Sequence, residues 1–209
     1  LVSSRGVPWE AVREGLAEGQ RRNREYHGVE TAFIIDLDRT LPEEIALEHT
    51  KLAVQAANDL GIPGLGLDCQ ERGYPAGRLK SSFEFAKANG LRLTAHAGED
   101  GGAASVWDAL DCGVERIDHG VQSVEDQKLL EELAERQTLL TVCPLSNVAL
   151  CVFPSLEQHT LPQLIEAGIP VCENSDDPPM FASNLETEVE AVQATFGYDD
   201  TFMAGLLRN

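Results

Sequence analysis

The sequence has 209 residues, of which 35 are acidic and 16 are basic, so the formal net charge is −19. A surface this negative repels phosphate backbones and anionic membranes, so we expect a protein that binds neither nucleic acid nor a membrane. Hydrophobic residues make up 43% and charged residues 24%, which is typical of a globular protein and excludes a disordered chain.

The cysteine pattern indicates a reducing compartment. There are five cysteines and no C-x-x-C pair, and the sequence begins without a charged and then apolar leader. No apolar run approaches the roughly 18 residues that a membrane-spanning helix needs. We therefore expect a cytoplasmic protein.

Short apolar runs that end in polar residues recur along the chain and predict strands. They cover residues 31–37, 64–68, 91–96, 114–119, 139–143 and 169–173. The segments between them carry helix signals, so the pattern predicts a parallel α/β sheet.

The helix signals are of two kinds. Thr40 and Thr160 each precede a Leu-Pro pair, which is typical of a capping box with proline in the first turn, and Ser123 is expected to open a further helix. Gly61 and Gly168 are expected to end the first two of these helices.

The position of the polar residues distinguishes a closed barrel from an open sheet. Nearly every predicted strand ends in charged or polar side chains, which is typical of a (β/α)₈ barrel, and the sequence has no glycine-rich phosphate loop. We expect a TIM-type barrel with about six of its eight βα units. Residues 1–209 would form a single partial domain, with residues 1–30 a helical or loop segment before the barrel.

Three strand ends carry residues suited to metal-assisted proton transfer. His96 ends one strand and Glu99 follows it after a small Ala-Gly turn, which brings an imidazole and a carboxylate together. Asp176 and Asp177 end the last strand, and a buried pair of carboxylates needs a cation or donors. His119 ends the strand between them, on a face predicted to hold residues 115, 117 and 119.

Each of these residues also has a purely structural interpretation. His96 and Glu99 would then lie in an ordinary turn, Asp177 would cap a helix that starts at proline, and His119 would be a satisfied core residue. Cys143 ends an apolar strand and is expected to be an inert buried cysteine. The other histidines, His159 among them, are given no role.

Four motifs in order resemble those of the adenosine/adenine deaminase family of zinc-dependent, amidohydrolase-type barrel enzymes. They are His-Ala-Gly-Glu (96–99), Arg-Ile-Asp-His-Gly (116–120), Cys-Pro-Leu-Ser-Asn (143–147) and Ser-Asp-Asp-Pro (175–178), and the resemblance runs from about residue 31 to residue 181. The sequence lacks the H-x-E and P-C-x-x-C pattern of the cytidine-deaminase type.

The resemblance implies a role for each of these residues. His96 and Asp176 would be ligands of one zinc ion, and Glu99 would protonate the purine ring as a zinc-activated water attacks the carbon that bears the amine. His119 would orient and help deprotonate that water or stabilise the developing charge. Asp177 would hydrogen-bond the purine.

One departure from the family pattern concerns the metal. Members supply two further zinc ligands from a His-x-His on the first barrel strand, and this sequence contains no H-x-H. We therefore expect a fragment that lacks its first barrel strands, binds metal weakly by itself and is inactive alone.

A second departure concerns the substrate. Nucleoside deaminases of the family typically follow the matching strand with Leu-Ala-Gly-x-Glu, whereas here Asp68 is followed by Cys-Gln-Glu-Arg-Gly. The glycine is thus displaced and Glu71 stands nearby, which resembles the free-base branch, and Asp68 and Glu71 are expected to contact substrate. We expect hydrolytic deamination of adenosine to inosine, with adenine as the alternative. A different metal-dependent hydrolase and a barrel that has lost catalysis also remain open, and the sequence does not indicate the oligomeric state.

Overall fold

The structure is a computed structural model that describes residues 5–209. By its internal contacts the chain divides into two compact units. The first contains the chain up to Cys69 together with Arg78–Leu93, and the second contains Gln70–Gly77 together with Thr94–Asn209.

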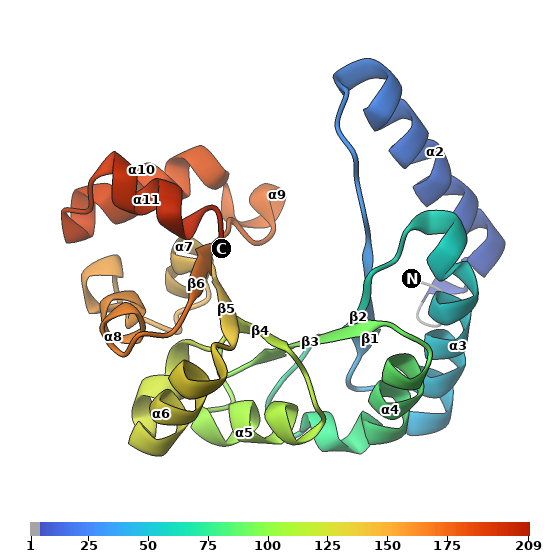
Figure 1. The fold of residues 1–209 in the computed structure, drawn as a ribbon, viewed down its shortest axis with the longest axis horizontal. Coiled ribbons are helices and arrows are strands. Elements are labelled where there is room, and N and C mark those ends of the chain that lie inside the picture. Colours follow the sequence, from blue (N-terminus) through green and yellow to red (C-terminus); the bar gives the residue numbers. More distant parts are fainter. Residues whose placement is uncertain (1–4) are drawn as a thin grey trace. The chain divides into compact units, whose positions relative to one another are not determined.

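Six parallel strands are hydrogen-bonded in chain order (Figure 1). They are β1 (Ile34–Asp38), β2 (Gly64–Asp68), β3 (Arg92–Ala97), β4 (Arg116–His119), β5 (Leu139–Val142) and β6 (Val171–Glu173). Strand β3 begins in the first unit, where Arg92 and Leu93 pair with β2, and continues in the second, where it pairs with β4. All six predicted strands are confirmed, and the largest shift is in the first, which begins at Ile34 instead of residue 31.

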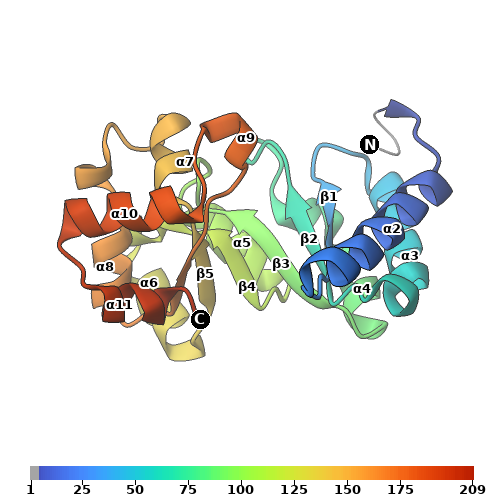
Figure 2. The same ribbon diagram turned by 90° about the horizontal axis from the view of Figure 1, so that it is seen from above.

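In the described part of the first unit the longer helices are α2 (Trp9–His27), α3 (Glu43–Leu60) and α4 (Lys80–Ala88). Helix α3 lies beside α2 in both views and also contacts α4 (Figures 1 and 2). It buries a stripe of mostly small residues: Ala46, Thr50, Ala53, Ala56 and Leu60. Gly61 ends it in the left-handed conformation, with φ of 59°, as predicted.

The capping box predicted at Thr40 is wrong. Helix α3 is preceded by Pro42 without a side-chain cap, and the hydroxyl of Thr40 donates instead to Asp38 Oδ1 at 2.6 Å. A carboxylate two residues earlier at the end of β1 is the nearer acceptor, so Thr40 stabilises a turn.

The second unit contains the remaining α-helices. They are α5 (Ala103–Asp111), α6 (Gln127–Arg136), α7 (Pro144–Ala149), α8 (Leu161–Glu166), α9 (Pro178–Phe181), α10 (Leu185–Phe196) and α11 (Asp200–Leu206). Three short 3₁₀ turns lie between elements: η1 (Ala76–Leu79), η2 (Val121–Glu125) and η3 (Leu156–Gln158). Helices α10 and α11 both contact β6.

Two further helix starts differ from the prediction. Ser123 lies inside η2, and Asp126 caps α6 by accepting from the backbone N–H of Lys128 at 2.9 Å. Thr160 does precede α8, but its hydroxyl donates to the carbonyl of Val121 at 2.7 Å. At α6 a nearby acidic residue supplies the cap, and at α8 a tertiary partner that the local sequence does not reveal takes the hydroxyl of Thr160.

In the second unit the two faces of the strands differ in polarity. Residues such as Ala95, Ile117 and Leu140 are fully buried, whereas alternate positions carry Thr94, Asp118 and Thr141. Among residues 5–209 no helix is long and apolar enough to cross a bilayer.

Candidate active site

Strand ends of the second unit bring four predicted site residues together: His96, Glu99, His119 and Asp176. The imidazole rings of His96 and His119 lie with centroids 5.0 Å apart, and His119 Nδ1 is 3.6 Å from Glu99 Oε1. Asp176 belongs to the same cluster, because one of its oxygens lies within 4.8 Å of a ring nitrogen of His119.

A left-handed backbone brings His119 into this cluster. The strand register places His96 opposite Asp118, so strict alternation would turn the His119 side chain to the other face of the sheet. His119 has φ of 66°, which ends the alternation and allows its ring to pack against His96. Sparsely populated backbone conformations of this kind are concentrated at functional sites.

The polar face of β4 therefore differs from the one predicted. Asp118, and not Ile117, shares a face with His96, and its carboxylate accepts hydrogen bonds from Thr94 at 2.6 Å and Thr141 at 2.5 Å. Arg116 lies 3.3 Å from the same carboxylate. Ile117 is fully buried on the opposite face, as its apolar side chain requires.

Glu99 is a poorly solvated carboxyl group. Its side chain is 20% exposed, and burial raises its pKa to about 7, opposed by His96 and assisted by the negative charges of Asp176 and Glu71. Glu99 Oε1 accepts a hydrogen bond from Asn147 Nδ2 at 2.9 Å. A carboxyl group with this pKa gives up and takes up a proton near neutral pH, which suits a general acid and base.

His119 is held neutral. It is 2% exposed, and burial lowers its pKa, with the neighbouring His96 acting in the same direction. A neutral imidazole donates a hydrogen bond through one ring nitrogen and accepts one through the other.

Asp176 also has a left-handed backbone, with φ of 57°. Ser146 donates a hydrogen bond to its Oδ2 at 2.5 Å, and Asp176 forms with His119 and Cys143 a group whose donor atoms all lie within 4.8 Å of one another. Imidazole nitrogen and carboxylate oxygen are zinc ligands, and this spacing lets one ion reach two or three donors. The donor set therefore fits a divalent metal.

Cys143 is the weakest member of that group. It is buried, and burial raises the pKa of its thiol well above the ordinary range, with the charges of Asp176 and Glu188 acting in the same direction. A protonated thiol is neither a nucleophile nor a metal ligand, in agreement with its interpretation as an inert core residue.

The other two residues predicted to bind substrate beside Glu71 are Asp177 and Asp68. Asp177 is exposed and lies at the start of α9, where its backbone carbonyl accepts from Met180 and Phe181. Asp68 ends β2 in the first unit: its carboxylate accepts from the backbone N–H of Cys69, and its carbonyl accepts from the backbone and side chain of Arg39.

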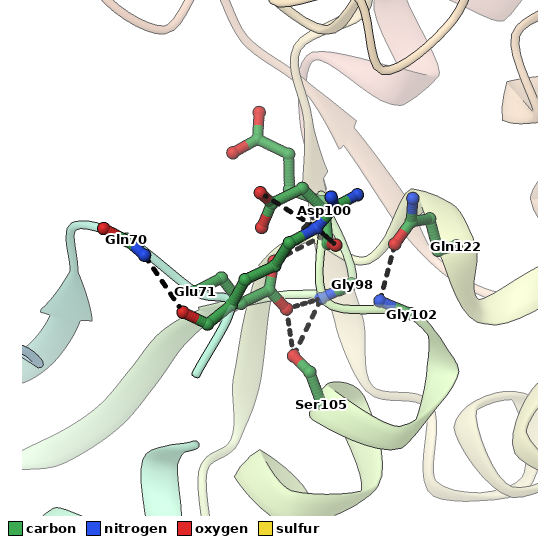
Figure 3. Close-up of polar contacts among 9 residues, drawn as sticks. Gln70, Glu71, Gly98, Asp100, Gly102, Ser105 and Gln122 are labelled. Carbon is green, nitrogen blue, oxygen red and sulfur yellow. Dashed lines mark hydrogen bonds and ion pairs between the residues drawn. The ribbon is translucent and has the colours of Figure 1, made fainter. Parts of the chain in front are cut away.

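Glu71 contacts the loop that follows β3, as Figure 3 shows. Its Oε1 accepts from the N–H of Gly98 at 2.5 Å and from the hydroxyl of Ser105, and its Oε2 accepts from the N–H groups of Glu99 at 3.1 Å and Asp100 at 2.9 Å. Both oxygens of this buried carboxylate are thereby occupied. Glu71 fixes the backbone that carries Glu99, and a contact between Glu71 and substrate stays a prediction.

Gly98 is required at the turn of this loop. It has φ of 70°, and a Cβ built there would lie 2.5 Å from Val106 Cγ2. A larger residue would therefore displace either α5 or the loop.

The motifs and the fold agree with a comparison to protein families. The adenosine deaminase family model matches residues 1–209, the whole chain. The chain belongs to the adenosine deaminase family. The predicted fold class, a parallel α/β sheet of the TIM-barrel deaminases, is confirmed.

Relatives of this adenosine deaminase family member include several named adenine deaminase. The proteins from Ectopseudomonas mendocina and Stutzerimonas stutzeri are 36% and 38% identical over 208 residues, which is 99% of this chain and 65% of each relative. The chain thus spans just under two thirds of the length of these relatives.

Two solved structures of related proteins are similar over nearly the whole chain. Adenine deaminase from Arthrobacter aurescens is 37% identical with a TM-score of 0.92, and covers 98% of this chain and 62% of its own. An amidohydrolase from Burkholderia ambifaria, crystallised with bound Zn, is 25% identical with a TM-score of 0.90, and covers 99% of this chain and 58% of its own.

Sequence reasoning missed two residues of this site. The sequence shows Asn147 only as part of a motif and indicates no role for His159. Both are buried and hydrogen-bonded to each other, and Asn147 is also hydrogen-bonded to Glu99 and His119. The position of Asn147 directly after Ser146 at a strand end was a usable signal. Nothing in the sequence near His159 links it to the site.

Proposed function

We propose that this protein is a hydrolytic deaminase of a 6-aminopurine, with adenine as the favoured substrate. The observation that carries the proposal is the pairing of Glu99, with its pKa near 7, with the neutral and buried His119 beside Asp176. The sequence alone favoured adenosine. The relatives named adenine deaminase support the alternative instead.

The metal in this proposal is zinc, held by His96 and Asp176 together with ligands that this chain's motifs do not supply. The zinc bound to the Burkholderia ambifaria amidohydrolase supports the choice of metal, and the imidazole of His96 and the carboxylate of Asp176 are side chains of the kind that zinc binds. When bound, zinc would lower the pKa of a coordinated water towards 7 and polarise the reacting centre.

The protein side chains would move the protons. Glu99, in its protonated form, donates to the ring nitrogen next to the carbon that bears the amine. That carbon becomes more electrophilic, and His119 stabilises the negative charge that develops on the attacking oxygen. Asp177 accepts a hydrogen bond from the purine. The Glu99 carboxylate takes one proton from the attacking water and passes it to the amine, which leaves as ammonia. The remaining water proton returns to Glu99, and a 6-oxopurine with a protonated ring nitrogen remains, so atoms and charge balance.

A direct comparison of substrates tests this proposal. We would express the protein from its complete coding sequence, load it with zinc, and follow product formation from adenine and adenosine separately. The proposal predicts a larger kcat/KM for adenine. A larger value for adenosine would reverse the substrate assignment. If a folded protein that holds zinc forms no product from either substrate, the proposal is wrong, and the protein is another hydrolase or a barrel without catalytic activity.

A further inference from the structure

A buried hydrogen-bonded chain leads from the end of η3 to the candidate site. His159 is 2% exposed and Asn147 is fully buried, and the two are joined by a 3.2 Å contact between His159 Nε2 and Asn147 Oδ1. The other end of the Asn147 amide, Nδ2, lies 2.9 Å from Glu99 Oε1 and 3.2 Å from His119 Nδ1. Neither His159 nor Asn147 has a role in the proposed reaction.

The chemistry of an amide fixes the direction of each bond. An amide oxygen only accepts, so His159 must donate through Nε2–H. The Nδ1 atom of the same ring accepts from the backbone N–H of Leu161 at 3.0 Å, which agrees with that tautomer. Burial lowers the pKa of His159 to about 4, so the ring is neutral and both of its nitrogens are satisfied.

The same logic applies at the other end of the amide. An NH₂ group has two hydrogens and accepts none, so one hydrogen goes to Glu99 Oε1 and the other to His119 Nδ1. These two acceptors are 3.6 Å apart, too far for a direct hydrogen bond, and the amide bridges them. Because His119 Nδ1 accepts, the proton of the neutral ring is on Nε2.

Reversing the amide would break every one of these contacts. Its oxygen would then face an oxygen of Glu99, and its NH₂ group would face a ring that already donates. His159 selects the observed orientation, because its other nitrogen is committed to Leu161. Ring contact with Phe153, with centroids 4.5 Å apart, holds the His159 plane.

We propose that His159 is a positioning residue that acts through Asn147: it holds the amide so that Glu99 and His119 both accept from it, which fixes the tautomer of His119. This inference rests on the proposed function for its catalytic meaning. The tautomer assignment itself does not depend on activity.

Two substitutions at His159 separate hydrogen bonding from packing. In His159→Gln the side-chain amide can still donate to Asn147 and accept from Leu161, whereas His159→Phe keeps a ring against Phe153 but donates nothing. We expect kcat to fall about tenfold or more in His159→Phe with KM changed by less than about threefold, and His159→Gln to retain most of kcat. Thr160→Val, which removes a neighbouring buried bond to Val121, is the matched control and should leave kcat near the wild-type value.

A spectroscopic measurement tests the inference without relying on turnover. Nitrogen NMR of the zinc-loaded wild-type protein distinguishes protonated from unprotonated imidazole nitrogens and needs no variant that must fold. We expect the protons of His119 and His159 on Nε2, and loss of the single His119 tautomer in His159→Phe.

The outcomes separate this inference from the proposed function. Predicted tautomers in a wild-type protein that deaminates no purine would contradict the function and support the network. An active protein with the His119 proton on Nδ1 would overturn the positioning role, as would equal kcat in His159→Phe and the wild type.

Discussion

The surroundings of Glu99 both raise its pKa and fix its position. Burial raises its pKa to about 7, Asn147 donates to one of its oxygens, and Glu71 holds the backbone N–H of the residue itself. The first effect favours the protonated acid and the other two fix its position. An acid that is both protonated near neutral pH and immobile is what the proposed proton transfer requires.

Replacing the Glu99 carboxyl group should abolish proton transfer without unfolding the protein. In Glu99→Gln the amide oxygen can still accept from Asn147, but the side chain has no acidic proton. We expect kcat to fall by about 10²–10⁴-fold with little change in the melting temperature, because a poorly solvated ionisable group has been removed. Steady-state kinetics and thermal unfolding check this, and kcat within a factor of a few of the wild type would exclude Glu99 as the proton donor.

Glu71 should affect the site by stabilising the loop that carries Glu99. In Glu71→Gln one acceptor oxygen becomes an NH₂ group that faces backbone donors, so we expect a loss of about 2 kcal/mol in the free energy of unfolding. Amide hydrogen exchange at Gly98, Glu99 and Asp100 should become faster. Gln70→Ala, at an exposed neighbour, serves as the control; unchanged exchange in Glu71→Gln would show that the carboxylate does not hold the loop.

Which site residues were predictable depends on how far their partners lie in sequence. Motifs at strand ends place His96, Glu99, His119 and Asp176, because the carboxyl ends of parallel strands meet. The network of Asn147 was not predictable, since its partners Glu99, His119 and His159 are 48, 28 and 12 residues away. The prediction that His119 shares a strand face with Ile117 was also wrong, because period-two alternation does not reveal a residue with a left-handed backbone.

At the scale of elements, strands were easier to predict than helix starts. Each strand is an apolar run bounded by polar residues, and all six were found within three residues of their ends. The caps at Thr40 and Ser123 failed because the side chains that decide them, Asp38 and Asp126, compete within a few residues. A local motif does not show which of several nearby side chains will form the hydrogen bond.

The packing of β6 against α10 contains a buried acidic pair. Glu173, on β6, is 1% exposed, and both of its carboxylate oxygens lack a hydrogen-bond partner among residues 5–209. Glu188, on α10, is fully buried, with Oε2 accepting from Leu145 at 3.2 Å. Burial raises the pKa of each to about 7, and Glu188 further raises that of Glu173.

This pair should make stability depend on pH. The folded state retains protons that the unfolded chain has lost above its pKa of about 4.5, so the free energy of unfolding falls as pH rises from about 4.5 to about 7. In Glu173→Gln that dependence should weaken, with a gain of about 1–3 kcal/mol at pH 8 and little at pH 4. Denaturant unfolding across this range measures the dependence, and a variant whose stability varies with pH as the wild type's does would contradict a buried proton on Glu173. Glu190→Gln on the same helix is the control.

For the molecule as a whole, the net charge of −19 has consequences for the substrate. Adenine and adenosine are neutral, so the field of the protein neither attracts nor repels them, whereas it would repel a purine nucleotide. The charge therefore agrees with an uncharged substrate and does not choose between base and nucleoside.

The dependence of kcat/KM on salt concentration should show that the substrate is uncharged. We expect kcat/KM for adenine to change by less than about twofold between low and high salt, because screening has no charged substrate to act on. For a negatively charged nucleotide substrate, kcat/KM would instead increase as the salt concentration rises. A steep salt dependence with adenine would indicate that another charged species takes part in binding.

The central claim is that water replaces the amine of a 6-aminopurine. The most direct test incubates the zinc-loaded protein, expressed from its complete coding sequence, with adenine in water enriched in a heavy oxygen isotope, with Glu99→Gln as the matched control. We predict hypoxanthine that carries one heavy oxygen, ammonia in equal amount, and neither product above background from the variant. No hypoxanthine from the folded wild-type protein, or equal amounts from wild type and variant, would contradict the account.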